Sequence, residues 1–164
     1  MFTSVFVQLR SWIFILLLSA ASGLVRPAGA EMQQFTGQTV YVPVYSHIYS
    51  GDREQPFYLA ATLSIRNTDR THPIQLTAVE YFDSSGKFLK HYLDRSIQRA
   101  AMATKRFVVP ESDKSGGSGA KFIVQWRSDM PVAAPLIESV MISTKTQQGI
   151  SFTSRGQVLE AVSP

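Results

Sequence analysis

The residues best suited to contact a ligand lie in one stretch, Val40–Tyr49. In a β-strand alternate side chains point to opposite faces, so the valines and Ile48 would share one face and turn toward the core. The other face would carry a row of rings: Tyr41, Pro43, Tyr45, His47 and Tyr49. Because proline cannot donate to a neighbouring strand, this row is predicted on an edge strand. Exposed, it would stack on sugars or pack against a partner; the alternative is that another segment of the domain covers it, with His47 as a structural histidine.

A second candidate is the glycine-rich segment from Asp113 to Lys121, in which Gly116, Gly117, Ser118 and Gly119 follow one another. Successive amides in such a segment can form a nest that binds an anion. A phosphate loop or a nucleophile elbow would have to lead into a helix, whereas Lys121 begins a predicted strand. Catalysis by Ser118 is therefore not predicted. The structural alternative is a turn in which Asp113 accepts hydrogen bonds from loop amides.

The three histidines, His47, His72 and His91, lie in separate segments and lack the short spacing of a metal site. We predict no catalytic residue, no metal ligand and no cofactor. Two other functions remain open: a hydrolase that pairs His47 or His91 with a carboxylate such as Asp113 or Glu138, and a metal-dependent sensor module.

Glu138 alternates with apolar residues on its predicted strand, which marks it as a candidate buried acid. A buried carboxylate must be paired or must shift its pKa, and such groups often serve function. The alternatives are an ion pair with an arginine such as Arg127 or Arg155, or a position at a strand edge that faces water.

These residues are expected on short β-strands, because apolar runs alternate with turn-rich clusters and no long segment has helical periodicity. Seven to eight strands predict an all-β fold, a single immunoglobulin-like β-sandwich with Trp126 in its core. A change of apolar parity near Ala78 predicts a β-bulge, and hairpin turns are predicted at Asp83–Gly86 and at Gln147–Gly149. In the run Phe57–Asn67, alternation places Leu59, Ala61, Leu63 and Ile65 on the buried face and Tyr58 on the polar face. The main predicted strands are Thr39–Ser50, Phe57–Asn67, Ile74–Phe82, Lys87–Leu93, Lys105–Val109, Lys121–Arg127, Leu136–Thr144 and Gly149–Leu159.

Residues 1–30 of the 164 have the three parts of a cleavable signal peptide: the charge of Arg10, the apolar run Trp12–Ala21 and the small-residue end Pro27–Ala30. Cleavage would leave residues 31–164 as one β-sandwich domain, with its core at about 37–159. An uncleaved leader, the alternative, would be the domain's link to a membrane. The net charge of +4 includes Arg10 and Arg26, which leaves +2 for the domain, too little to predict nucleic-acid binding. The absence of cysteine rules out disulfides and a lipidated cysteine.

Several segments of this chain resemble an uncharacterised family of bacterial secreted proteins, domain of unknown function 3124, over most of residues 37–159. The segments are Val40–Tyr49, Leu63–Asp69, Ser115–Ala120 and Gly149–Gly156. The resemblance implies a bacterial envelope protein and supplies no reaction, cofactor or site residue. We therefore expect a periplasmic or extracellular, non-catalytic binding or interaction module, with an envelope protein or polysaccharide as its partner.

Overall fold

The computed structural model describes residues 33–52, 54–144 and 149–164. The predicted signal peptide, and Gln147-Gln148 of the predicted last turn, lie outside these residues. Among the described residues there is no helix long and apolar enough to cross a membrane. Residues Gln33–Pro164 form a unit of their own.

Runs rich in β-branched and aromatic residues form twelve strands in the described part of the chain, and every pairing between them is antiparallel. The strands are β1 (Gln34–Val44), β2 (His47–Ser50), β3 (Gln55–Tyr58), β4 (Ala60–Arg66), β5 (Ile74–Phe82), β6 (Phe88–His91), β7 (Ile97–Arg99), β8 (Thr104–Val109), β9 (Ala120–Ala133), β10 (Leu136–Ser143), β11 (Ile150–Arg155) and β12 (Gln157–Val162).

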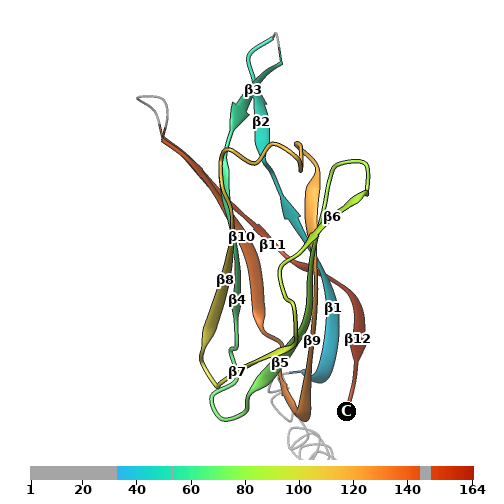
Figure 1. Cartoon of the computed structure of the whole chain (residues 1–164). Helices are drawn as coiled ribbons and strands as arrows, with labels where there is room; N and C mark the ends of the chain where they lie inside the picture. The colour runs from blue at the N-terminus through green and yellow to red at the C-terminus, as the bar shows by residue number, and fades with distance from the viewer. Residues whose placement is uncertain (1–32, 53, 145–148) are drawn as a thin grey trace, which may run out of the picture. The chain divides into compact units, whose positions relative to one another are not determined.

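Ten of these strands form two sheets that face each other (Figure 1). The six-stranded sheet has the order β12-β1-β9-β5-β6, with β7 paired to β5, and the four-stranded sheet has the order β11-β10-β4-β8. The strands β2 and β3 pair with each other and extend beyond one end of the sandwich. The predicted all-β, immunoglobulin-like sandwich is thus confirmed in its general architecture.

The hydrophobic core lies between the sheets because each strand turns alternate side chains inward. On β1 the inward residues are the three valines, as predicted, and on β9 they include Trp126, which is 2% exposed. The run leading into and through β4 buries Leu59, Ala61, Leu63 and Ile65, also as predicted. Burial of this apolar surface from both sheets is the main force that holds them together.

The predicted number of strands, seven to eight, is smaller than the twelve of the described residues. Three predicted runs each divide into two strands, at Tyr45-Ser46, at Leu59 and at Gly156, and β7 was not among the predicted strands. At the first two of these breaks the backbone N–H of Ser46 donates to the carbonyl of Gly117 (2.9 Å), and that of Leu59 donates to the carbonyl of Ser46 (3.0 Å). The β2–β3 hairpin therefore begins and ends at one fixed base.

Two local predictions for β5 agree with the structure. Its register against β9 shifts between Leu76 and Ala78, beside the predicted bulge. The turn after β5 is held by Asp83, whose Oδ1 accepts hydrogen bonds from the N–H groups of Ser85 (2.8 Å) and Lys87 (2.9 Å). Gly86 supplies the positive φ of 88° that this turn requires.

The edge position predicted for the strand of Pro43 is wrong for most of β1, which lies between β12 and β9. Pairing with β12 ends at Tyr41, however, so Pro43 lies where β1 has lost that neighbour. The carbonyl of Pro43 accepts a hydrogen bond from the hydroxyl of Ser139 on β10, in the four-stranded sheet. The missing N–H of proline therefore leaves no strand partner unsatisfied.

The chain crosses from the four-stranded to the six-stranded sheet at Gly156, between β11 and β12. The Gly156 N–H donates to the carbonyl of Ile137 (2.8 Å). A Cβ at this position would lie 2.6 Å from a methyl carbon of Val40 and 3.1 Å from the Ile137 carbonyl oxygen. A glycine is thus required for the backbone to approach β1 and β10 this closely.

Candidate functional site

The β2–β3 hairpin gathers ring side chains on one of its faces. Its register places His47 opposite Tyr58 and Tyr49 opposite Pro56. Directly opposed residues of an antiparallel pair share a face, so these four side chains point to the same side. The residues between them pack against the hydrophobic core. We call the surface made by His47, Tyr49, Pro56 and Tyr58 the hairpin face.

The rings of the hairpin face contact each other edge to face. The His47 ring centroid lies 5.1 Å from that of Tyr49 and 5.9 Å from that of Tyr58. The Lys114 ammonium lies 4.2 Å from the centre of the Tyr58 ring, a cation–π contact. Tyr49 is 55% exposed and Pro56 is also exposed. The hairpin thus presents two exposed and two half-buried rings beside one positive charge, and its turn carries the exposed acids Asp52 and Glu54.

His47 is not held by a hydrogen bond at its Nδ1 atom. That nitrogen is buried and has no partner among the described residues. An unsatisfied buried polar atom costs free energy, so the two aromatic contacts must hold the ring. The hydrogen-bonded structural role considered for His47 is therefore not seen at this atom.

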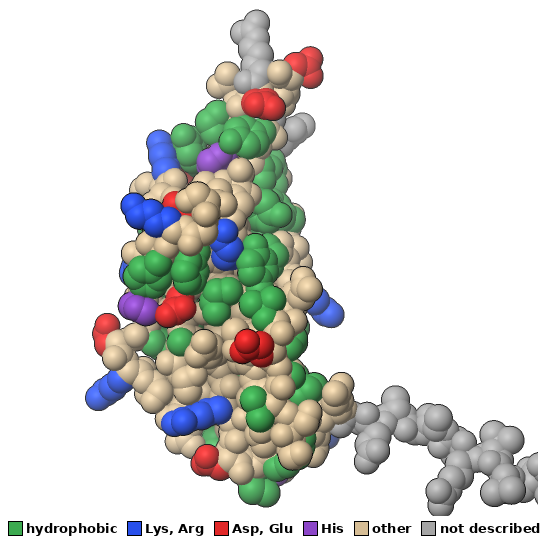
Figure 2. Space-filling model, turned by 90° about the vertical axis from the view of Figure 1, so that its right-hand side faces the viewer, with side chains coloured by type: hydrophobic (Ala, Val, Ile, Leu, Met, Phe, Trp, Pro, Cys, Tyr) green, Lys and Arg blue, Asp and Glu red, His purple; other side chains and the backbone are tan. Residues whose placement is uncertain are grey.

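The predicted row of five rings does not stay together, because its strand ends at Val44. Tyr41 lies in register with Ile123 in the six-stranded sheet. The Tyr45 ring instead packs edge-on against Phe152, 5.7 Å between centroids, at the margin of the core. Only His47 and Tyr49 of the predicted row belong to the hairpin face. Figure 2, seen from the side of β1 and β12, shows hydrophobic side chains gathered in its upper half, toward the hairpin.

Three residues at the hairpin face were not predicted as site residues from the sequence: Pro56, Tyr58 and Lys114. Tyr58 was assigned to the polar face of one long strand, and the break at Leu59 moves it into the hairpin. No sequence signal indicates that Lys114, more than fifty residues away, covers its ring. Both facts depend on where the chain turns.

The glycine-rich loop packs against the base of the same hairpin. The buried Gly116 carbonyl accepts from the Ser84 N–H (2.9 Å) and hydroxyl (3.0 Å), and the Gly119 N–H donates to that hydroxyl (2.8 Å). Asp113 Oδ1 accepts from the N–H of Ser115 (3.0 Å). These bonds are internal to the fold. Gly117, with a φ of 78°, adopts a conformation that favours glycine.

Two tyrosines lie beneath this loop. The Tyr81 hydroxyl is hydrogen-bonded to the Ser46 hydroxyl (3.1 Å), and burial raises the pKa of Tyr81, reinforced by the charge of Asp113. Burial, with Tyr81 and Asp113 nearby, raises the pKa of Tyr92 to about 12. The Tyr92 hydroxyl is buried and has no hydrogen-bond partner among the described residues. Tyr81 and Tyr92 are thus uncharged rings on which the loop packs, and we call them the aromatic floor.

Glu138 forms its ion pair with an arginine that the sequence did not indicate. The partner is Arg66 on β4, whose Nη2 lies 3.2 Å from Glu138 Oε1, and not Arg127 or Arg155. On β10 the buried side chains include Ile137, Ser139 and Met141, which alternate with Glu138. Glu138 therefore lies on the outer face, and its side chain is 15% exposed. Arg155 lies directly opposite Glu138 in the register but is exposed.

Two histidines lie near carboxylates, though not the carboxylates considered from the sequence. His91 Nδ1 is 3.6 Å from Glu80 Oε1, with 60% of the His91 side chain exposed. His72 Nδ1 is 3.3 Å from Asp69 Oδ1, which also accepts from the N–H groups of Thr71 and His72 and therefore has a strongly lowered pKa. In the described ranges no three His, Asp or Glu side chains are grouped closely enough to hold a metal ion. The His91–Glu80 contact is a histidine–carboxylate pair, the kind of pair that the hydrolase alternative requires, and neither residue lines the hollows at Arg127 or the one beside Gly156.

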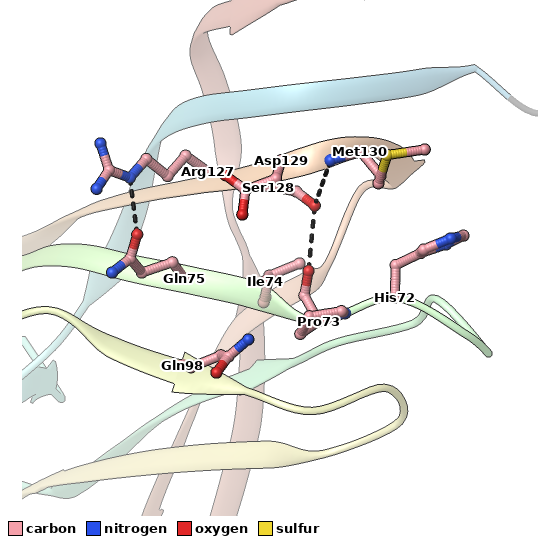
Figure 3. Close-up of a pocket in the computed structure, with 9 residues that line it drawn as sticks. All are labelled: His72, Pro73, Ile74, Gln75, Gln98, Arg127, Ser128, Asp129 and Met130. Carbon is pink, nitrogen blue, oxygen red and sulfur yellow. Dashed lines mark hydrogen bonds between the residues drawn. The ribbon is translucent and has the colours of Figure 1, made fainter.

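A hollow of about 340 Å³ lies at the start of β5 (Figure 3). Arg127 and its successors on β9 form one wall, and Gln98 of β7 lies across β5 from them. The Ser128 hydroxyl donates to the carbonyl of Pro73 (3.1 Å), which ties the two elements together. His72 lies at one end of the hollow. None of the predicted site residues lines it.

The fold and the hairpin face define an all-β sandwich that carries a ring-lined hairpin at one end. The chain belongs to the family described as "Protein of unknown function (DUF3124)", whose model matches residues 37–159. The resemblance stated from the sequence phrases is thereby confirmed.

The comparison with solved structures matches this chain to the crystal structure of Thermotoga maritima 1070. The similarity covers 76% of this chain and 96% of that one, with 11% sequence identity and a TM-score of 0.43. No curated protein matches the chain.

Proposed function

We propose that this protein is an exported, non-catalytic interaction module of the bacterial envelope, which docks its hairpin face into a groove on another envelope protein. The observation that carries the proposal is the hairpin face itself: exposed Tyr49 and Pro56 beside half-buried His47 and Tyr58, on an element that extends beyond the sandwich (Figure 1). Tyrosine side chains offer a large apolar area with a polar tip and few rotatable bonds, and they are enriched among the residues that dominate protein interfaces.

The shape of the hairpin favours a protein partner over a small ligand. Small molecules bind in hollows that enclose most of their surface. The hairpin projects, and its hydrophobic reverse side packs on its own core, which fixes the direction of the rings. Lys114 adds a positive charge above Tyr58, whereas Asp52 and Glu54 add negative charge at the hairpin turn. The partner's groove is therefore expected to be aromatic or apolar, with an acidic group that meets Lys114.

Site-specific photo-cross-linking in the encoding organism tests this function. A photoreactive phenylalanine analogue replaces Tyr49, or Val108 as a control of similar exposure on β8 (55% and 50%). We expect an adduct with one envelope protein from position 49 and not from position 108. With that protein purified, Tyr49→Ser should weaken binding at least about thirtyfold, the effect of losing a dominant interface residue. Equal adducts from both positions, or unchanged binding by Tyr49→Ser, would refute the proposal.

Export is tested separately by mass spectrometry of the protein from fractionated cells. The signal-peptide pattern predicts a mature N-terminus near residue 31 in the periplasmic or extracellular fraction. An intact Met1 in those fractions would contradict cleavage, and recovery in the cytoplasm alone would contradict export.

A further inference from the structure

We infer that the outer face of the six-stranded sheet carries a second binding site, centred on Arg127, for a neutral oligosaccharide. This site lies apart from the hairpin face and goes beyond the proposed docking function. Its ligand is defined by chemistry: a chain of uncharged sugar units whose hydroxyl groups both donate and accept hydrogen bonds.

Two hollows meet at Arg127 and Ser128, which line both of them. One is the hollow of Figure 3, about 340 Å³, and the other, about 380 Å³, lies over β1 and β12. Each volume is in the range of small-ligand sites, which hold about 300–1,000 Å³. A ligand that spans both hollows would pass over Arg127 and needs at least two ring-sized units.

The sheet register explains why space exists beside Arg127. Gly37 on β1 and Gln75 on β5 are its direct neighbours on either side. Gly37 has no side chain, so the surface sinks between Arg127 and Val162, the next residue in that row. A Cβ at position 37 would lie 3.0 Å from the Trp126 carbonyl oxygen, a tight contact with backbone, so this position does not readily accept a side chain.

Arg127 is held in place from one side only. Its Nε donates to Gln75 Oε1 (2.8 Å), and the Gln75 amide donates in turn to the Ser96 hydroxyl (3.1 Å). Figure 3 shows the guanidinium beyond this bond, turned away from β5. No carboxylate of the described chain lies within ion-pair distance of Arg127. A fixed guanidinium with free terminal N–H groups loses little entropy when it binds a ligand.

The groups around Arg127 match hydroxyls better than a charged ligand. Acceptors and donors with free capacity line both hollows: the side chains of Thr77, Gln98, Gln125 and Asp129 form no hydrogen bond to other described residues. Two acids, Asp129 and Glu160, flank the single arginine, so an anionic ligand would be repelled by their like charges.

Apolar surface for the C–H faces of sugar rings is also present. Met130, which is 53% exposed, and Pro73 line the first hollow. The lower half of the face in Figure 2 carries fewer hydrophobic side chains than the upper half. The hairpin face and the outer face of the six-stranded sheet therefore differ in the chemistry of their surfaces, and they suit different partners.

The test is a titration of the ¹⁵N-labelled protein, followed by amide NMR shifts. The probes are linear tetrasaccharides of glucose, galactose, mannose and N-acetylglucosamine, with tetragalacturonate as the anionic comparison. We expect at least one neutral tetrasaccharide to shift the amides of both Gly37 and Gln98, one in each hollow, and its monosaccharide to bind at least about tenfold more weakly. Arg127→Ala should lower the affinity by roughly tenfold to a hundredfold, the effect of losing charge-assisted hydrogen bonds.

The matched control is Arg106→Ala. Arg106 is an exposed strand arginine on β8 of the other sheet, and it should leave the affinity unchanged. The inference is overturned if no neutral tetrasaccharide shifts these amides, if tetragalacturonate binds more tightly, or if Arg106→Ala weakens binding as much as Arg127→Ala. None of these outcomes bears on the hairpin cross-link, so the two proposals fail independently.

Discussion

Replacing Gly116 by alanine is expected to destabilise the fold by about 2–4 kcal/mol, although it adds one methyl group. Gly116 is buried where the glycine-rich loop meets the aromatic floor. The new Cβ would overlap the Tyr81 hydroxyl oxygen and lie 2.8 Å from both the Ala120 Cβ and the Ser46 Oγ. Tyr81 and Ser46 form a buried hydrogen bond with each other, so neither hydroxyl can move away from the methyl group without breaking that bond.

The magnitude combines two costs. Overpacking a dense core costs about 1–3 kcal/mol. Moving Tyr81 away breaks its bond to Ser46, which costs about 1 kcal/mol more. For a domain of this size the sum corresponds to a fall in Tm of about 10 °C.

Urea unfolding of four proteins measures the effect: wild type, Gly116→Ala, Tyr81→Phe and the double variant. Removing the Tyr81 hydroxyl takes away the worst overlap, so the double variant should be more stable than the sum of the single losses predicts, by about 1 kcal/mol or more. Gly149→Ala is the control, because its Cβ would come no closer than 3.8 Å to the other residues that the structure describes. A loss below about 0.5 kcal/mol for Gly116→Ala, or strictly additive losses, would refute this account of the loop.

Three further changes have expected outcomes. Gly156→Ala should cost about 1–3 kcal/mol in urea unfolding, because its Cβ would press on Val40, while Gly149→Ala stays near wild type. The pKa of Tyr92 in the folded protein, about 12, exceeds the ordinary value of about 10, so its contribution to stability is complete below pH 10 and is lost as pH rises toward 12. Ultraviolet titration should show one tyrosine that ionises late and that Tyr92→Phe removes. Ionisation of Tyr92 near pH 10 would contradict the burial argument. Glu138→Gln should shift the unfolding free energy by about 1 kcal/mol or less, since Arg66 is 50% exposed, and a larger loss would mean that the pair acts as a buried one.

The sequence alone predicted features that arise from neighbours along the chain. Side chains alternate with a period of two in a strand, so the burial of the valines in β1 and of Leu59–Ile65 followed from parity. The turn at Asp83–Gly86 was predicted because an Asp side chain and a glycine with positive φ are local solutions to chain reversal. The change of parity near Ala78 identified the bulge for the same reason.

The tertiary structure decided which distant segments meet. Nothing near Tyr45 in the sequence shows that the strand ends at Val44, because that break is held by Gly117, from a loop far along the chain. The same packing brings Lys114 over Tyr58 and pairs Glu138 with Arg66. Order and register between strands depend on how two sheets bury their apolar faces together, and a single sequence does not record that choice. Strands, faces and turns are therefore local properties of this chain, whereas the hairpin face and the Arg127 hollows exist only where the sheets assemble.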